Sequence, residues 1–533
     1  MAGIFPCGSL SCFMGGKKMK ISTVEEMRRI DKLAAENFGL DEMLLMENAG
    51  HAAADVMTEV MGTVAGKTVA VLAGSGNNGG DAYAAARHLL SRGAKVTIYA
   101  VGNAEHMKKA AKLNRDICAK LGIPIRSLDK EHDWDKLRVF LCLADGVLDG
   151  ILGTGVRGPI RDVEDRLIRI VNEEARSVVA IDVPSGVNAE TGEVNGAAIM
   201  ATATVTFGLP KAGLFFCPGA ECAGRLVVDS ISLPQALLGD KGILQEHLDD
   251  ELARTLLPVR AMDAHKGTCG RVLVVAGSRG MTGAAALTSE AVLRVGAGLV
   301  TLASADSLAD VFAMKLTEVM TSPLPEIRAG VLGETAMEGL AALLPRFDTV
   351  LMGPGLGRAP ETGALVRRFA SRVRVPLVLD ADALYAFQGH TEELRHIGAP
   401  LVLTPHLGEM AALLGIKVPQ LRSQLLGHCR KAAADWKAVL VVKSECTIVV
   451  FPDGRVYFTS KGNPGMATAG AGDVLAGAVA GLMCEAGGEN APLLGVYLHG
   501  LAGDIAMKSK AEGLLAGDIL AMLPEARRAL QEE

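Results

Sequence analysis

The stretch GNPGMATAGAGDVLAG, residues 462–477, decides the fold of this chain of 533 residues. Its glycines and proline predict a loop, and the apolar run that follows predicts a helix over residues 474–483. Gly470 and Gly472 let the backbone direct its N–H groups to one point, where the helix N-terminus adds unpaired N–H groups of its own. Such a loop suits a phosphate. Asp473, in the first helical turn, is placed either to accept a proton from a substrate hydroxyl or to cap the helix.

The composition is typical of a multidomain α/β protein. The length exceeds one typical domain, and 49% hydrophobic with only 4% aromatic residues indicates cores of Ala, Val, Leu and Ile, which suit buried parallel strands. A net charge of −6 without a large basic cluster argues against nucleic-acid binding. Ten scattered cysteines without a C-x-x-C pair favour a reduced cytoplasm. The chain has no apolar run of about 18 residues, so no membrane span is predicted, and residues 1–18 lack the features of a signal peptide.

In the first half of the chain, the ends of three predicted strands carry polar residues. These are Asn78, within the run GSGNNGGD at 74–81, then Asp149, and then Asp182 with Ser185. Open α/β sheets bind ligands at the carboxyl ends of their strands, so three such ends in succession predict one site.

Two familiar nucleotide-binding motifs are near matches only. Residues 74–79 have the spacing G-x-G-x-x-G, but the next strand, 95–100, does not end in the acidic residue that would bind a ribose. A plain dinucleotide-dependent dehydrogenase is therefore the weaker interpretation. Residues 62–68, GTVAGKT, resemble a P-loop, but they lack one spacer residue and precede their strand instead of following it.

The motifs of residues 20–235 resemble those of the NAD(P)H-hydrate epimerase family. The resemblance implies interconversion of the R and S forms of NADH and NADPH hydrated at the nicotinamide ring, with Asp182 as the acid/base. It also implies a potassium ion held by oxygen atoms of Asn78, Asp149 and Ser185. Lys211 stays open as either a ligand contact or a surface charge. The implied contacts of the hydrated nucleotide are Asn77, Asn78, Gly79, Gly80, Asp81, Gly153, Thr154, Gly155, Val156, Arg157, Gly158, Pro159 and Asp182.

In the second half, predicted strands and helices alternate, which is typical of a parallel sheet with helices on both faces. Strands lead into loops at 277–285, 353–357, 381–384, 404–409 and 443–447. Within these loops, His406 by itself is more typical of a helix start than of a ligand. Its place in the same row of loops as Asp473 favours a contact. Asp380 is interpreted as structural or as a contact of a magnesium-bound water.

Together with these loops, the run 462–477 resembles the ribokinase-like NAD(P)H-hydrate dehydratases, over about residues 245–525. Ala469, Ala471 and Ser444 depart from residues that the family often has. The resemblance implies that Asp473 activates the hydroxyl of the S hydrate to attack the terminal phosphoryl group of ADP or ATP. Backbone amides and Mg²⁺ would stabilise the transferred charge, and loss of phosphate would restore the ring double bond. The implied substrate contacts are Ala284, Gly355, His406 and Asp473, and the implied nucleotide contacts are Lys443, Ser444, Glu445, Cys446, Thr447 and Gly472.

The sequence therefore predicts two α/β domains behind a loose extension at 1–18. Residues 19–240 would form a Rossmann-like three-layer sandwich with epimerase activity, and residues 241–533 a ribokinase-like α/β/α dehydratase that releases AMP, from ADP, and phosphate. We expect a cytoplasmic homo-oligomer whose partners are hydrated NADH or NADPH and an adenine nucleotide, with no nucleic acid and no membrane. The main alternative is a ribokinase-like kinase of a vitamin or sugar alcohol fused to a nucleotide-binding domain. A non-catalytic nucleotide sensor is the second.

Overall fold

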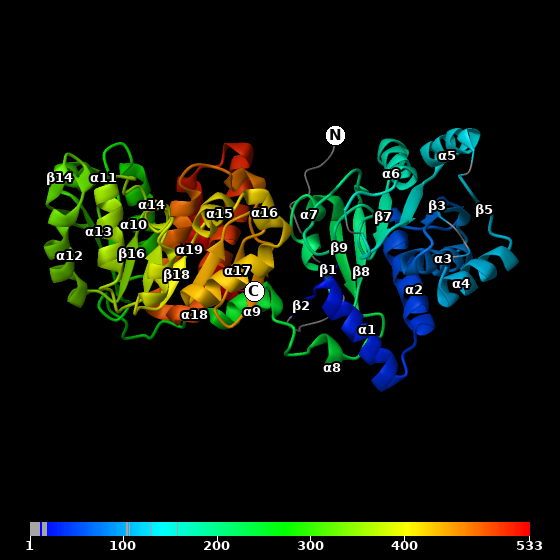
Figure 1. The fold of residues 1–533 in the computed structure, drawn as a ribbon, viewed down its shortest axis with the longest axis horizontal. Helices are drawn as coiled ribbons and strands as arrows, with labels where there is room; N and C mark the ends of the chain where they lie inside the picture. The colour runs from blue at the N-terminus through cyan, green and yellow to red at the C-terminus, as the bar shows by residue number, and fades with distance from the viewer. Residues whose placement is uncertain are drawn as a thin grey trace. The chain divides into compact units, whose positions relative to one another are not determined.

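A computed structural model of the protein describes residues 11–12, 19–102, 105, 107–128, 130–156 and 158–532. The chain divides into two compact units, the first ending at Gln245 and the second beginning at Glu246 (Figure 1). Of the extension predicted at 1–18, only Ser11–Cys12 is described, as the short strand β1. Arg157, predicted as a substrate contact, lies outside the described residues.

The first unit is built on a parallel sheet. Its described strands follow the order β1-β9-β8-β7-β6-β3-β4-β5. From β3 the chain runs through β4 to β5 at one edge, then returns to β6 beside β3 and continues toward the other edge. The order reverses between β3 and β6, and such a reversal leaves a crevice at the carboxyl ends of the strands. The strands are β3 (Thr68–Ala73), β4 (Lys95–Ala100), β5 (Ile125–Arg126), β6 (Gly146–Gly150), β7 (Val178–Ile181), β8 (Ala203–Phe207) and β9 (Arg225–Asp229).

Successive residues of a strand point to opposite faces of the sheet, and in this sheet both sets are buried. Helices therefore cover both faces. In β3, Val69 and Val71 belong to the core beneath one set of helices, whereas Ala70 and Leu72 belong to the core beneath the other. The helices α2, α3 and α4 lie on one face, and α5 and α6 lie on the other (Figure 1). Their bounds are α1 (Val24–Phe38), α2 (Glu42–Met61), α3 (Asn77–Ser91), α4 (Lys109–Lys120), α5 (Glu131–Leu143) and α6 (Asp162–Glu174).

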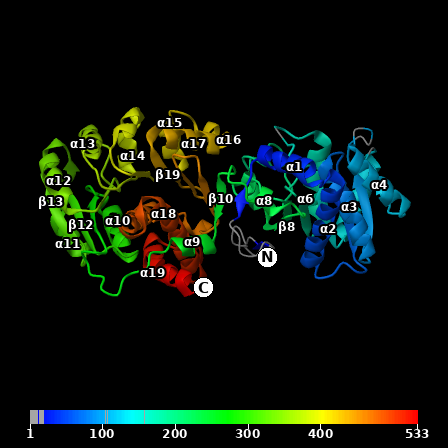
Figure 2. The ribbon, with the colours of Figure 1, turned by 90° about the horizontal axis from the view of Figure 1, so that it is seen from below.

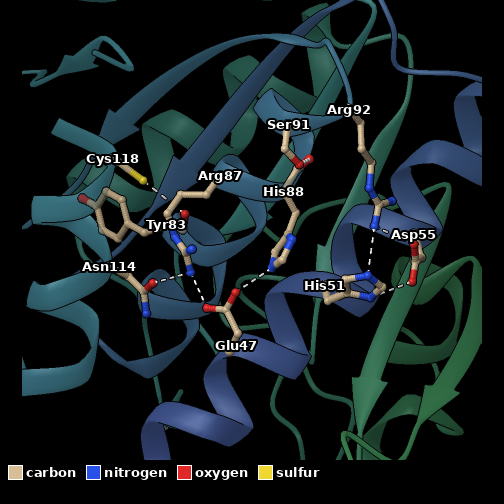
Figure 3. A network of polar contacts seen from close by, with 10 residues as sticks. All are labelled: Glu47, His51, Asp55, Tyr83, Arg87, His88, Ser91, Arg92, Asn114 and Cys118. Atoms are coloured by element: carbon tan, nitrogen blue, oxygen red, sulfur yellow. Dashed lines mark hydrogen bonds and ion pairs between the residues drawn. The ribbon is translucent and has the colours of Figure 1, made fainter. Parts of the chain in front are cut away.

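A polar network joins α2 to α3 and α4 (Figure 3). Glu47 of α2 accepts a hydrogen bond from Arg87 of α3, and its Oε1 lies 2.9 Å from Nε2 of His88. Arg87 also donates from Nη2 to Oδ1 of Asn114 in α4, at 2.8 Å. Since α3 begins at Asn77, the network anchors the helix whose first turn carries predicted site residues.

The second unit contains a larger sheet, whose strands follow the order β13-β12-β11-β16-β17-β18-β19-β20-β21. The chain order reverses between β11 and β16, so this sheet also has a crevice position. From β13 to β19 the pairing is parallel, as predicted, but β20 and β21 are antiparallel. The loops at 443–447 and 451–455 are too short for the crossover that a parallel pair requires. The strands are β11 (Arg271–Val275), β12 (Leu299–Ala305), β13 (Met320–Leu324), β16 (Thr349–Met352), β17 (Leu377–Leu379), β18 (Leu401–Leu403), β19 (Ala438–Val442), β20 (Ile448–Val450) and β21 (Val456–Thr459).

Figure 2 shows α10, α18 and α19 on one side of the second sheet and α13, α14, α15 and α17 on the other. The three-layer arrangement predicted for this half is therefore confirmed. The helices are α10 (Thr282–Arg294), α13 (Pro360–Ala370), α14 (Asp382–Ala386), α15 (Leu407–Leu414), α16 (Val418–Ser423), α17 (Leu425–Trp436), α18 (Ala471–Lys510) and α19 (Ala516–Glu532). The smaller elements of the two units are β2 (Lys20–Ile21), α7 (Gly219–Ala223), α8 (Gln235–Leu238), β10 (Gln245–Leu248), α9 (Asp250–Leu256), α11 (Ala309–Lys315), β14 (Glu326–Arg328), β15 (Val331–Leu332) and α12 (Met337–Leu343).

The element α18 is a helical hairpin. Its backbone leaves the helical region at Gly487 (φ 81°, ψ 169°), and the segment after this break packs back on the segment before it. A Cβ atom at Gly495 would lie 2.7 Å from the side chain of Val479. The predicted helix 474–483 falls inside the first segment, which begins at Ala471. In the part of the chain that is described, no helix is both long and apolar enough to cross a membrane.

Candidate active sites

A cavity of about 780 Å³ opens in the first unit at the reversal between β3 and β6. Its walls come from the loops after these strands, from the first turn of α3, and from α1 and α2. The structure brings most of the predicted substrate contacts together here, although they come from separate parts of the sequence. Those that line the cavity are Asn77, Asn78, Asp81, Gly153, Thr154, Gly155, Val156 and Asp182; Gly79, Gly80, Gly158 and Pro159 do not line it.

Most of the run GSGNNGGD is helical, because α3 already begins at Asn77, although glycine and asparagine favour turns. Its glycines serve close packing as well as turning. A Cβ atom at Gly79 would lie 1.9 Å from the carbonyl oxygen of Gly74, and one at Gly80 would lie 2.5 Å from Met46. The helix therefore tolerates two interior glycines, and their neighbours Asn78 and Asp81 approach the sheet closely enough to line the cavity.

Asp182 follows β7 with a positive φ of 63° and lies against a buried lysine. Its Oδ1 accepts hydrogen bonds from Lys211 Nζ at 2.5 Å, Thr206 Oγ1 at 3.1 Å and the N–H of Phe207 at 3.3 Å. Lys211 is only 1% exposed, so its interpretation as a surface charge is wrong. Asp182 thus forms an ion pair with a buried lysine and accepts two further hydrogen bonds at the same oxygen.

Asp81 has very different surroundings within the same cavity. Burial raises the pKa of this carboxyl well above its usual range, and the negative charges of Asp182, Glu42 and Asp31 raise it further, against the smaller effect of Lys211. Asp31 and Glu42 also line the cavity. Both lie on helices that precede the first site motif, and nothing in the sequence singled them out.

Two of the three predicted potassium ligands, Asn78 and Ser185, meet at the carbonyl of Leu152, and the third, Asp149, contacts Ser185. Asn78 donates from Nδ2 to this carbonyl at 2.6 Å, and Oγ of Ser185 lies 3.2 Å from it. Asp149 is fully buried and accepts from Oγ and N–H of Ser185 at 2.6 and 2.9 Å. Burial raises the pKa of Asp149 to about 6, although the hydrogen bonds from Ser185 lower it. Oδ1 of Asn78 is buried without a hydrogen-bond partner, so the cluster has oxygens that fit a weakly hydrated cation.

In the second unit, Asp473 lies beside an ion pair that joins two strand ends. Lys443 donates from Nζ to Oδ1 of Asp380 at 2.8 Å, and Thr404 donates from Oγ1 to the same oxygen at 2.7 Å. A Cβ atom at Gly472 would lie 3.2 Å from Nζ of Lys443, so the ammonium group reaches the N-terminus of α18. Burial and then the negative charge of Asp380 raise the pKa of Asp473 to about 7, while Lys443 lowers it. A carboxyl that titrates near neutrality is suited to proton transfer.

His406 is the N-cap of α15. Its Nδ1 accepts hydrogen bonds from the N–H groups of Gly408 and Glu409 at 3.0 and 3.2 Å. The helix-start interpretation is therefore correct; 59% of the His406 side chain is exposed, and its Nε2 lies 3.5 Å from Oε1 of Glu409. The N–H of Lys443 donates to the carbonyl of Pro405 at 2.8 Å, which places His406 in the row of loops that contains the ion pair.

Two other predicted substrate contacts, Ala284 and Gly355, lie next to each other where the strand order reverses between β11 and β16. A Cβ atom at Gly355 would lie 3.2 Å from Cβ of Ala284. The N–H of Gly277 donates to the carbonyl of Pro354 at 2.9 Å and joins the two loops. The backbone at Gly355 has a φ of +62°, which favours glycine and lets the chain pass close to the start of α10.

The predicted nucleotide-binding residues 443–447 form the hairpin loop between β19 and β20. Ser444 donates from Oγ to the carbonyl of Cys446 at 2.6 Å, and Glu445 accepts from Arg422 at 2.8 Å. The Cys446 thiol faces inward, where Sγ lies 3.2 Å from the carbonyl of Thr459. The N–H of Thr459 in turn donates to the carbonyl of Thr447 at 3.2 Å, so the loop is closed by contacts of its own.

His499, which the sequence did not single out, supports the loop of Asp473. It lies in the second segment of α18, and its Nε2 is 2.9 Å from the carbonyl oxygen of Ala471. Burial lowers the pKa of His499 to about 4, so the ring is neutral. Since a carbonyl only accepts, Nε2 carries the proton and donates it.

The comparisons with known proteins cover nearly the whole chain. Family models described as "YjeF-related protein N-terminus" and "NAD(P)H-hydrate dehydratase" match residues 42–213 and 272–525. The bifunctional NAD(P)H-hydrate repair enzyme Nnr of Moorella thermoacetica is 42% identical over 97% of this chain and 98% of its own length. The chain belongs to the family of bifunctional NAD(P)H-hydrate repair enzymes. Another member of this family, from Escherichia coli, is 33% identical over 94% of this chain and 92% of its own length.

Solved structures of NAD(P)H-hydrate dehydratases match the second half of this repair enzyme. The ADP/ATP-dependent NAD(P)H-hydrate dehydratase from Bacillus subtilis, crystallised with ATP and Mg²⁺, is 27% identical. The match covers 53% of this chain and 98% of that one, with a TM-score of 0.47. The predicted family, the two α/β domains and the pairing of an epimerase with a dehydratase are thus confirmed. The domain limits, the roles of single residues and the homo-oligomer stay predictions.

Proposed function

We propose that the first unit exchanges the R and S hydrates of NADH and NADPH in its cavity, while the second unit dehydrates the S hydrate at Asp473. The proposal rests above all on the arrangement at the N-terminus of α18, where Asp473 has a pKa of about 7 beside the Lys443–Asp380 pair. One carboxyl poised to take a proton and one cation beside unpaired backbone N–H groups are the parts that phosphoryl transfer requires.

For dehydration, ionised Asp473 would accept the proton of the hydrate's hydroxyl group, whose oxygen then attacks the terminal phosphoryl group of ADP or ATP. The N–H groups of Gly470, Gly472 and Asp473 and the ammonium group of Lys443 would stabilise the charge on the transferred group. Phosphate then leaves with the electron pair of its bond to the ring, a ring proton is lost, and the double bond returns. With ADP as the donor, AMP is released.

Magnesium fits this site by the chemistry of its surroundings. Three further carboxylates, those of Asp380, Asp382 and Glu409, lie close enough to Asp473 to raise its pKa, and carboxylate oxygens together with nucleotide phosphates are the ligands that Mg²⁺ prefers. Bound there, Mg²⁺ supplies positive charge to the phosphoryl oxygens.

For the exchange of hydrates, Asp182 is the candidate acid/base, and residues Asn77 to Asp81 and Gly153 to Val156 are the candidate contacts of the nucleotide. A potassium ion would be held by Asn78, Asp149 and Ser185, where it would fix the two loops at the reversal of the sheet. The unpartnered Oδ1 of Asn78 supports this assignment.

The test uses the purified full-length chain and a mixture of R and S hydrates, with reduced nicotinamide followed by its absorbance. Without nucleotide no reduced cofactor should appear, whereas with ADP and Mg²⁺ both hydrates should be converted, because exchange replenishes the S form. In Asp182→Asn the S hydrate should disappear at the normal rate and the R hydrate should lag behind. A phosphorylated product that persists would instead identify a kinase.

A further inference from the structure

Two partly buried carboxyl groups with different hydrogen bonds, Asp81 and Asp182, line the cavity of the first unit. Asp182 has three donors on Oδ1, one of them the Lys211 ammonium group. The Asp81 carboxyl has no hydrogen bond or ion pair with any described residue, and the charges that act on it are those of Asp182, Glu42, Asp31 and Lys211. Two neighbouring carboxyl groups in such different surroundings are suited to different roles, one as the acid and the other as the charged partner.

We infer that Asp81 supplies the proton in the exchange of R and S hydrates, while Asp182 stays in its ion pair with Lys211. This assignment rests on the proposed epimerase function of the first unit and names its acid. Asp81 is thereby assigned as a catalytic residue. Asp182, which was expected to act as acid and base, is assigned only the role of a charged group beside the ring.

The chemistry of the hydrate explains why a protonated acid is needed. A dihydronicotinamide ring contains enamine double bonds, which take up water at the carbon bonded to nitrogen. The R and S hydrates therefore differ at a carbon that bears both nitrogen and oxygen. Inversion there requires one of these bonds to open, and a protonated hydroxyl group leaves far more readily than hydroxide.

The step balances without any oxidant or co-reactant. Asp81 transfers its proton to the hydroxyl oxygen, the C–O bond breaks with its electron pair on water, and the nitrogen lone pair forms a C=N⁺ bond. A water molecule then adds to the opposite face and forms the new C–O bond. Its proton returns through cavity water to the Asp81 carboxylate. Throughout, the ionised Asp182 stabilises the positive ring, as a fixed charge in a partly desolvated site does.

The surroundings of Asp81 favour the protonated form of its carboxyl group. Burial and three neighbouring carboxylates raise its pKa well above the usual range. Of the nearby cations, Lys211 is paired with Asp182, and Nζ of Lys108 lies 3.5 Å from Oε1 of Glu42, so neither is paired with Asp81. Because the acid acts in its protonated form, the exchange rate should fall as pH rises through this pKa.

The experiment measures R/S exchange by the full-length chain at saturating K⁺. Nucleotide is left out, so that no dehydration takes place. Rates are taken between about pH 6 and pH 10 for wild type, Asp81→Asn, Asp81→Glu and Asp182→Asn. Loss of the general acid should slow exchange in Asp81→Asn by roughly 10²–10⁴-fold and remove the fall in rate at high pH. Asp81→Glu keeps a carboxylic acid, so it should recover part of the exchange rate and part of the decrease in rate at high pH.

Asp182→Asn separates the two assignments even if Asp81→Asn fails to fold. It removes a negative charge beside Asp81, so the fall in rate at high pH should remain and move to lower pH. If Asp182 were the acid, this variant would lose the fall altogether and Asp81→Asn would keep it, which would overturn the inference. In ¹⁸O-labelled water, retention of the original oxygen during inversion would also overturn it. Absence of exchange in wild type would instead refute the proposed function.

Discussion

Dehydration by the second unit should depend on pH through Asp473, whose pKa burial and Asp380 raise to about 7. Asp473 accepts a proton in the reaction, so only its ionised form is active and the rate should rise with pH. A group with a pKa of about 7 is ionised in roughly one molecule of ten at pH 6 and nine of ten at pH 8, which gives a roughly tenfold rise in turnover.

Asp380→Asn tests the cause of this pKa. The substitution removes a negative charge that raises the pKa of Asp473, and it frees Lys443, whose positive charge lowers it. Both changes act in the same direction. The midpoint of the pH profile should therefore move below that of wild type, and the ratio of turnover at pH 8 to that at pH 6 should shrink.

The assay follows the formation of reduced cofactor from the S hydrate at saturating ADP and Mg²⁺. Thr404→Val is the matched control, because it removes a hydrogen bond to Asp380 and leaves both charges in place. Asp473→Asn should lower turnover by roughly 10²–10⁴-fold and leave no midpoint near neutrality. An Asp380→Asn profile with an unmoved or raised midpoint would refute the electrostatic reasoning, and near-normal turnover in Asp473→Asn would return this residue to the role of a cap.

Three further predictions concern the units one at a time. Residues 246–533 expressed alone should dehydrate the S hydrate at the rate of the full-length chain, because they form a compact unit; an inactive but folded fragment would contradict this division. Asp149→Ala should weaken R/S exchange and abolish its dependence on K⁺, and an unaltered K⁺ titration would exclude the proposed ligand. His499 has a pKa of about 4, whereas the unfolded chain binds this proton near 6.5. The free energy of unfolding, measured by urea denaturation, should therefore fall by about 3 kcal/mol on acidification between these two pH values. His499→Gln should flatten this dependence on pH, and an unchanged dependence would contradict the assignment of a neutral, buried His499.

Much of the fold is predictable because buried strands carry a local signal. The branched apolar run at 68–73 coincides with β3, and the run at 95–100 coincides with β4. The start of α3 was not predictable in this way. Glycine weakens a helix interior by its local propensity, and Gly79 and Gly80 are accepted only because neighbouring chain lies too close for a Cβ atom. The hairpin of β20 and β21 was missed because alternation alone does not specify strand direction.

The candidate site residues likewise fall into those that a local sequence signal predicts and those that depend on how distant segments pack. Residues at strand ends, such as Asn78, Asp149 and Asp182, were predictable because sheet topology places consecutive ends side by side. The Asp380–Lys443 pair was not, since it joins residues 63 positions apart, and its geometry depends on how two loops pack. His499 reaches the loop of Asp473 only because α18 folds back on itself.

Because α18 folds back on itself, the two sites can form only one after the other during translation. The first unit is complete once residue 245 has emerged, so its cavity can form while the rest of the chain is still being translated. The loop at 470–473 emerges far later and remains without its buried hydrogen bond until His499 has also been made. A chain truncated within the second segment of α18 would therefore keep the site that inverts the hydrate and lack the one that removes it.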